Sequence, residues 1–208
     1  MLQINQVPQL NTLRFINDHT EGQRLGRPTP FAHVADNDWA VGLFVEHLSK
    51  SKIWNQCAVF VLEDDAQNGP DHVDAHRSTA YIAGGFVKRN FIDHTMYSTS
   101  SMLRTIELIL GLPPMSQYDA AAEPMWRCFN TTSNQLPFQS IPSNIDLNDK
   151  NTIQTASAIL SESFNLTKED AIPDMLFSNV IWKAVKGENS IMPSPKRSAF
   201  VKIMAHED

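Results

Sequence analysis

The spacing of apolar residues predicts a helix followed by a buried strand in the first third of the chain. After Asp36 and Asn37, apolar side chains recur at helical intervals at Val41, Phe44, Val45 and Leu48. A helix is therefore predicted from about Trp39, with Asp36 or Asn37 as its N-cap. Residues 57–62 form a continuous apolar run, which is typical of a buried strand in a parallel sheet. A helix beside such a strand indicates the α/β class.

A second strand and a capped helix are predicted further along the chain. Residues 80–83, Ala-Tyr-Ile-Ala, favour a short strand. The hydroxyl side chains of residues 98–101 can cap a helix that runs through Leu110. This helix is predicted to end at Gly111, which precedes a pair of prolines.

The last third of the chain carries two more helical patterns. The first covers about residues 153–164. The second has Thr167 as its predicted N-cap, with Asp170 in the capping-box position, and ends near Gly187. Pro173 lies inside this second pattern, where it either kinks the helix or marks its true start.

These patterns divide the chain into three parts. Residues 1–128 hold the predicted α/β elements. Residues 129–150 are polar and contain proline, which predicts a long surface loop. Residues 151–208 are predicted to form a helical segment that packs on the same domain.

Composition excludes several classes of protein. The chain has 208 residues, and 42% of them are hydrophobic, which is enough for a core and argues against wholesale disorder. No apolar run approaches the roughly 20 residues that span a bilayer, and the first residues lack the pattern of a signal peptide. The net charge of −6 argues against binding nucleic acid over a broad surface. Cys57 and Cys128 are too few for a disulfide scaffold or a zinc ribbon, although a single bridge stays open.

Acidic and histidine residues are concentrated in the loop 63–77, directly after the first predicted strand. Asp64 and Asp65 are adjacent, and such close negative charges are costly unless a cation or a proton neutralises them. Carboxylate and imidazole ligands suit zinc, manganese or iron. A calcium-binding EF-hand is rejected because Ala66 and Ala75 stand at two ligand positions. The alternative is a solvated acidic surface loop.

Asp-His dipeptides recur at residues 18–19, 71–72 and 93–94. The first is flanked by Arg14 and Arg24. In such a site an imidazole can protonate a leaving oxygen, and a guanidinium can hold a phosphoryl group. The alternative for each arginine is a surface ion pair.

Four blocks of sequence together resemble a bacterial phosphoesterase family of the alkaline phosphatase superfamily, related to phospholipase C-type and acid phosphatase-type enzymes. The blocks are Asp18-His-Thr-Glu-Gly22, Asp36-Asn-Asp-Trp-Ala-Val-Gly42, residues 63–77 and residues 93–114. The resemblance covers about residues 10–130 and extends more loosely to Phe200. The order of the blocks is specific to the family, and it does not specify a substrate.

The resemblance implies an α/β/α sandwich and a metal-dependent hydrolase that acts on phosphoric esters. The divalent metal implied is zinc, manganese, iron or calcium. The metal ligands implied are Asp18, Asp64, Asp65 and His94. The catalytic or phosphate-contacting residues implied are His19, His72 and Arg77, with His76 beside them.

One departure from the family pattern changes the expected activity. In the family, a metal-binding carboxylate and the Ser or Thr nucleophile precede the Asp-His-Thr block. The residues before Asp18 contain no acid and only one hydroxyl side chain, that of Thr12. Residues 1–128 are therefore expected to be the C-terminal part of such a catalytic domain without its N-terminal strands. Family members are often periplasmic or secreted, and the compartment of this chain stays open.

Three interpretations follow from the sequence. The first is an incomplete phosphoesterase. The second is a non-catalytic metal- or anion-binding fragment that needs a partner, either the missing N-terminal half or another chain. The third is an α/β domain whose acidic loop is only solvated.

Overall fold

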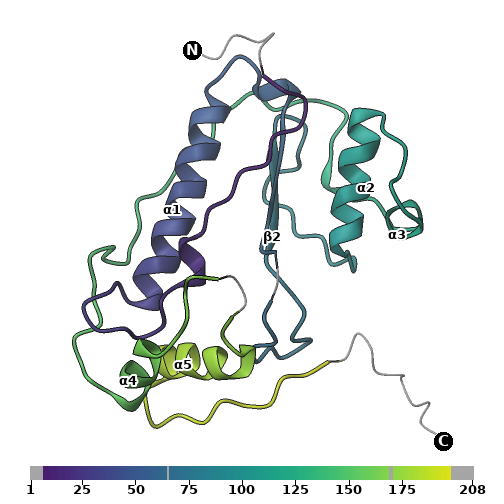
Figure 1. Ribbon diagram of the computed structural model, residues 1–208. Coiled ribbons are helices and arrows are strands. Elements are labelled where there is room, and N and C mark those ends of the chain that lie inside the picture. Colours follow the sequence, from purple (N-terminus) through teal and green to yellow (C-terminus); the bar gives the residue numbers. More distant parts are fainter. Residues whose placement is uncertain (1–6, 65, 169–170, 198–208) are drawn as a thin grey trace, which may run out of the picture. The chain divides into compact units, whose positions relative to one another are not determined.

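The computed structural model describes residues 7–64, 66–168 and 171–197, and the chain separates into two compact units (Figure 1). Unit 1 comprises Met1–Arg14, Gly42–Val61 and Ala80–Ser140. Unit 2 comprises Phe15–Val41, Leu62–Thr79 and Ile141–Asp208. Helix α1 (Pro30–Ser49) contributes residues to both units.

The described sheet has two antiparallel strands, β1 (Ala58–Leu62) and β2 (Ala80–Gly84). Both strands lie where the sequence predicts them, but the expected parallel sheet is wrong for the residues described. Most of β1 is only half-buried. An apolar run indicates how much of a strand can be buried, whereas the strand's partner and direction depend on where the chain returns.

Gly84, the last residue of β2, lies where the two strands approach each other closely. A Cβ atom at Gly84 would lie 2.4 Å from the carbonyl oxygen of Cys57, so no other residue fits without moving the backbone. The close approach keeps the strands paired at this end.

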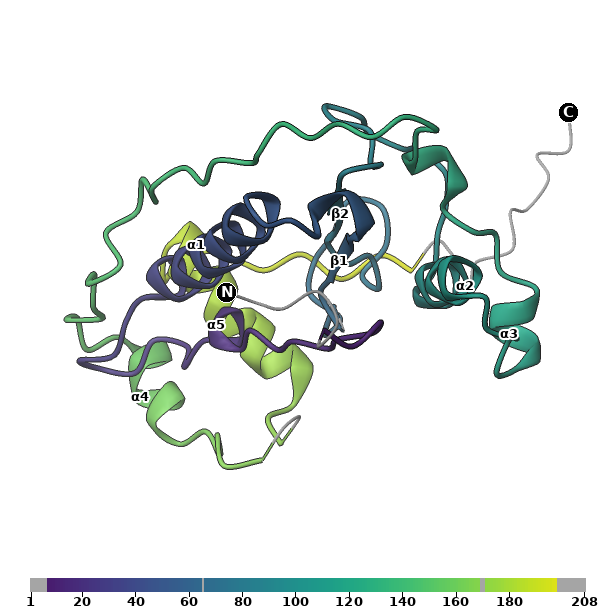
Figure 2. The same ribbon diagram turned by 90° about the horizontal axis from the view of Figure 1, so that it is seen from above.

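In unit 1, helix α2 (Thr99–Leu110) is capped as the sequence predicts. Ser98 is the N-cap, and Ser98 and Ser101 form a reciprocal capping box. Gly111 ends the helix with φ of 69°, a left-handed conformation that glycine adopts at little cost. Helix α3 (Gln117–Ala120) packs beside α2 (Figure 2).

The core of unit 1 lies between α2 and the sheet. Its buried members are Met102, Met125 and Cys128. The half-buried apolar residues around them are Phe60, Ile82, Tyr97, Ile106 and Phe129. Unit 1 also contains two short 3-10 helices, Trp54–Gln56 (η3) and Trp126–Cys128 (η4), and the second one carries Cys128 of this cluster. Both cysteines are free, so the single disulfide that the sequence allowed is not formed. Burial raises the pKa of both thiols.

Helix α1 begins nine residues before the predicted start. The Thr29 hydroxyl accepts a hydrogen bond from the Ala32 amide at 3.2 Å, and Pro30 occupies the first helical position. The Thr-Pro pair is therefore the true start signal. Asp36 lies inside the helix, where its carboxylate accepts a hydrogen bond from the Asn17 side chain.

The other helices of unit 2 are shorter than the sequence predicts. Helix α4 (Ala156–Glu162) is capped by Thr155. Helix α5 (Asp174–Lys186) begins directly after Pro173, so this proline marks the true start rather than a kink. Thr167 does not cap α5, because it bonds to the side chain of Asn165 instead. The predicted capping-box residue Asp170 lies outside the described residues.

Residues 129–150 contain no helix or strand and are largely exposed, apart from isolated bridges at their two ends. The helices in the described part of the chain include none that is both long and apolar enough to cross a bilayer.

Candidate functional site

The second half of the acidic loop, residues 71–77 in unit 2, forms a compact polar cluster. Asp71 Oδ1 accepts hydrogen bonds from the amides of Val73 at 2.6 Å and Asp74 at 3.0 Å. Its other oxygen accepts from the Arg77 guanidinium at 2.8 Å. The Arg77 hydrogen bond is the main reason that the pKa of Asp71 falls to about 2. The loop is therefore held by an ionised Asp71.

A buried carboxylate orients a histidine within the same loop. Asp74 is only 6% exposed. Its Oδ1 accepts a hydrogen bond from the His76 amide at 2.9 Å and lies 2.8 Å from His76 Nδ1. Such a contact favours the tautomer with the proton on Nδ1 and leaves Nε2 as the basic nitrogen. The His76 side chain is 45% exposed, so the imidazole is oriented by the protein and reachable from solvent.

His72 and Arg77, both predicted from the sequence, lie next to each other. His72 Nδ1 is 3.4 Å from the Arg77 guanidinium and 3.9 Å from Asp71. The His72 side chain is 80% exposed. The structure thus brings an imidazole and a guanidinium together at the surface, although Asp71 already compensates the arginine charge.

Two more cations approach this loop from a distant part of the sequence. The Lys196 carbonyl accepts a hydrogen bond from the Ala75 amide at 2.6 Å, and its ammonium group donates to the His72 carbonyl at 3.2 Å. Arg197 forms an isolated bridge with Asp74 and donates to the Asn68 side chain at 3.0 Å. Sequence reasoning missed both residues, because nothing in their surroundings links them to residues 71–77.

His19 lies against the first half of the same loop. The His19 ring packs on Phe177 with centroids 5.4 Å apart. These two side chains and Gln67 line a cavity of about 10 Å³, which is enough for about one water molecule. Asp18, its neighbour in the 3-10 helix η2 (Asn17–His19), is exposed.

The proposed metal ligands are not brought together in the described part of the chain. His94 belongs to unit 1, whereas Asp18 and Asp64 belong to unit 2, and Asp65 lies outside the described residues. Within residues 7–64, 66–168 and 171–197, no group of three or more His, Cys, Asp or Glu side chains could hold a metal ion. The described residues therefore do not fit a complete metal site, and no chemical step is derived through one.

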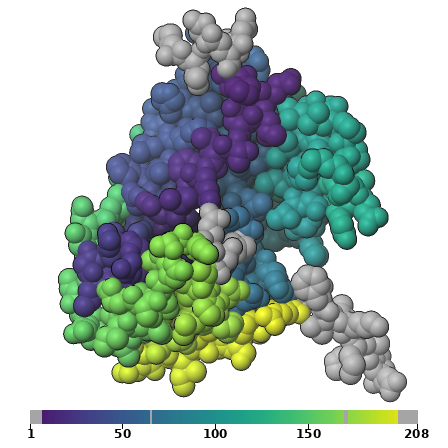
Figure 3. Space-filling model, in the orientation of Figure 1, coloured from purple at the N-terminus to yellow at the C-terminus, as the bar shows by residue number. Residues whose placement is uncertain are grey.

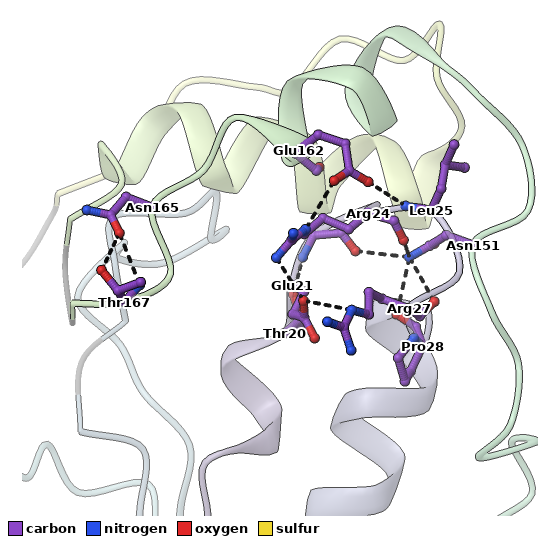
Figure 4. Close-up of polar contacts among 12 residues, drawn as sticks. Thr20, Glu21, Arg24, Leu25, Arg27, Pro28, Asn151, Glu162, Asn165 and Thr167 are labelled. Atoms are coloured by element: carbon purple, nitrogen blue, oxygen red, sulfur yellow. Dashed lines mark hydrogen bonds and ion pairs between the residues drawn. The ribbon is translucent and has the colours of Figure 1, made fainter.

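Arg24, a candidate phosphoryl contact, is engaged by acidic side chains of unit 2 (Figure 4). Its guanidinium lies 3.2 Å from Glu21 and 3.4 Å from Glu162. Glu21 also pairs with Arg27 at 3.4 Å. For Arg24 the structure thus shows the ion pair that the sequence left as an alternative.

An asparagine fixes the loop that carries these arginines. The Asn151 Nδ2 atom faces four backbone carbonyl oxygens at 3.1–3.4 Å, those of Gly22, Arg24, Arg27 and Pro28 (Figure 4). Within the same loop, the Gln23 amide donates a hydrogen bond to the Ser161 hydroxyl at 3.0 Å. The surfaces of this loop and of α4 adjoin in Figure 3. The loop is thus held in place by residues far apart in the sequence.

The comparisons with known proteins returned no match, either among family models, among curated proteins or among solved structures. The structure itself shows a mixed α/β protein with an Asp-His-Arg loop at the surface of unit 2.

Proposed function

We propose that this chain acts in a metal-dependent phosphoesterase of the alkaline phosphatase superfamily, with residues 71–77 as the segment that contacts the phosphoryl group. The observation that carries the proposal is the pairing of His76 with the buried Asp74, beside Arg77 and His72. The four sequence blocks support the family assignment, and an α/β/α sandwich is part of the proposal.

The loop supplies two kinds of group that phosphate-ester hydrolysis needs. Arg77 offers N–H donors to phosphate oxygens. The contact between Asp74 and His76 Nδ1 orients the imidazole, so His76 Nε2 can pass a proton to a leaving oxygen. Lys196 at His72 and Arg197 at Asn68 bring positive charge to this loop, which offsets the repulsion of an anion by its carboxylates.

The metal dependence of the proposal comes from the family resemblance, in which Asp64 and Asp65 are the first ligands. Zinc, manganese, iron and calcium all accept such ligands.

The alternative is a non-catalytic module that binds an anion or a metal and requires a partner chain. Two observations favour it. The described residues assemble no three-ligand metal group. In addition, large apolar side chains of unit 1 such as Ile92, Met96 and Trp126 are exposed.

Phosphate binding and phosphatase turnover separate the two functions. We expect the chain to bind inorganic phosphate and Arg77→Gln to weaken this binding about tenfold, since a hydrogen bond to a charged group contributes about 1.5 kcal/mol. Lys52→Gln, which removes one positive charge from unit 1, is the matched control. Calorimetric titration measures both variants.

Turnover of p-nitrophenyl phosphate by the chain alone is expected to be weak with any of the four metals. Divalent metal should raise the melting temperature, and Asp64→Asn should abolish that rise. Phosphate binding without any turnover would support the non-catalytic module. Strong turnover that survives Asp64→Asn would contradict the proposed site.

A further inference from the structure

Strand β1 has the sequence of a central strand, although it lies at the edge of the described sheet. Its residues, Ala-Val-Phe-Val-Leu, include no charge, no proline and no glycine. Proteins use charges, prolines or bulges on edge strands to prevent pairing with other chains. In the part of the chain that the structure describes, β2 is the one strand that pairs with β1. The other edge of β1 therefore lacks both a paired strand and this protection.

The backbone groups at this second edge can be identified from the pairing with β2. The Glu63 amide donates a hydrogen bond to the Thr79 carbonyl at 3.1 Å, so the Glu63 backbone faces β2. Backbone groups of successive residues in an antiparallel strand point to opposite edges, so those of Ala58, Phe60 and Leu62 point away from β2. Within the described residues, no hydrogen bond from another segment reaches these three residues' backbone groups.

The packing of Phe60 agrees with this register. Pairing of Glu63 with Thr79 places Phe60 directly opposite Ile82, and both side chains pack against the core cluster of unit 1. In Figure 2, α2 lies beside a face of the sheet rather than beyond the edge of β1. Phe60 thus directs its side chain toward the α2 face and its backbone groups toward the second edge.

The outer edge of β2 is less available for pairing. The Gly84 carbonyl, which points away from β1 in this register, accepts a hydrogen bond from the Val87 amide at 3.2 Å. A turn of the chain itself therefore occupies one end of that edge. The edge of β1 is the one along which a further strand can pair over the full length of the strand.

We propose that this edge is a homodimer interface, in which β1 pairs antiparallel with β1 of a second copy of the chain. The outward-facing residues are centred on Phe60, so such a pair places Phe60 opposite Phe60 of the second copy, and Ala58 opposite Leu62. In each of these pairs both residues exchange their N–H and C=O groups. The two sheets join into one continuous sheet around a two-fold axis, the commonest symmetry of soluble dimers.

The sequence of β1 favours a second copy over an unrelated chain as the occupant. In the symmetric register, Glu63 lies opposite Cys57 of the second copy rather than opposite another acid, so the two strands meet without repulsion between like charges. The two Phe60 side chains lie on the same face of the joined sheet, and such aromatic cross-strand pairs are stabilising. The strand is therefore complementary to itself in both charge and hydrogen bonding.

Hydrogen exchange tests the dimer in the unmodified chain. In the dimer the amides of Ala58, Phe60 and Leu62 are hydrogen-bonded, whereas those of Val59 and Val61 bond to β2 in either state. We expect exchange of the first three amides to slow at least about tenfold as the chain is concentrated, while the other two stay unchanged. Sedimentation velocity should show a monomer–dimer equilibrium over the same range of concentration.

A proline at the edge supplies a matched pair of variants. Ala58→Pro removes an outward-facing donor and leaves the bonds between β1 and β2 in place. Cys57 has φ of −112° and ψ of 142°, the extended backbone that a residue before proline adopts. Each copy loses a hydrogen bond to the other, so the dissociation constant of the dimer should rise at least about tenfold. Ala80→Pro, the same change at an exposed residue on the outer edge of β2, should leave the dimer unchanged.

The proposal is overturned if the chain stays monomeric at every concentration tested, or if it dimerises while Ala58→Pro and Ala80→Pro weaken the dimer equally. Protection of Ala58, Phe60 and Leu62 in the dilute monomer would also reject it, because another part of the chain would then occupy the edge. If Ala58→Pro does not fold, hydrogen exchange of the unmodified chain decides the question.

Discussion

The acidic residues of loop 71–77 and those on α2 and α3 differ in how their negative charge is compensated. In the loop, Asp71 pairs with Arg77 and Asp74 pairs with His76, so each carboxylate has a basic partner near solvent. Between the helices, Glu107 and Asp119 lie together out of solvent with one arginine beside them. The first arrangement can exchange partners with a ligand, whereas the second is closed to solvent. Burial and pairing, rather than the number of acids, separate a candidate binding site from a structural contact.

The largest effect is expected where the buried acid itself is removed. Glu107→Ala removes the buried acid that pairs with Arg104, and it should lower the free energy of unfolding by about 3 kcal/mol. Glu123→Ala, which breaks an exposed ion pair with Arg127, should cost less than about 1 kcal/mol. Urea denaturation measures both variants. Equal losses would show that burial does not distinguish the two acids.

A smaller loss is expected at the buried acid of the loop. Asp74→Ala removes two hydrogen bonds to His76 and should lower the free energy of unfolding by about 1–2 kcal/mol, because water can reach the half-exposed imidazole. It should also weaken phosphate binding, since His76 loses its orientation. Asp38→Ala on the exposed side of α1 is the control for both readouts. A loss of stability with unchanged phosphate binding would remove His76 from the proposed site.

Helix caps should cost the same in the two units, because capping is local. Thr29→Ala at α1 and Ser98→Ala at α2 each remove an acceptor for a backbone amide, and each should cost about 1 kcal/mol. Thermal unfolding of the two single variants and of the double variant measures this. We expect the two losses to add, because each cap bonds within its own helix. A much larger loss at Thr29 would show that the hydrogen bond its hydroxyl donates to Asp149 also stabilises the fold.

The smallest expected effect is an acid-side difference at Asp71. Its pKa is about 2 in the folded chain and about 3.9 in the unfolded chain, so its contribution is complete above about pH 4 and is lost as the pH falls toward 2. Wild type should therefore lose slightly more stability than Asp71→Asn over this range, as acid titration followed by circular dichroism would show. Asp119 titrates over the same range in both proteins, so its contribution cancels. Identical acid profiles would contradict the Asp71–Arg77 pairing.

Much of the local structure could be predicted from the sequence. Both strands, the capping of α2 by Ser98 and its end at Gly111 follow from short-range patterns, and the structure confirms them. The start of α1 was missed because Asp36 and Asn37 are good caps in isolation, whereas Thr29 and Pro30 form the cap in the structure. Capping preferences identify where a helix can begin, and competition between caps decides where it does.

The candidate site was predicted only in part. His72 and Arg77 lie together as expected, because they are five residues apart on one loop. The Asp74–His76 pair was not singled out, although the two residues are separated by only one position. Lys196 and Arg197 carry no sequence signal at all, since their role depends on a contact with a loop more than a hundred residues away.

The sequence by itself determined the elements of this protein: which segments form helices and strands, and where acids and histidines concentrate. These properties depend on neighbouring residues, which the sequence lists directly. Only the tertiary structure decided that β1 and β2 pair antiparallel, that Asp74 orients His76, and that Glu107 and Asp119 are buried. The physical reason is that strand direction, burial and charge pairing depend on which distant groups displace water from one another, and local spacing does not encode that.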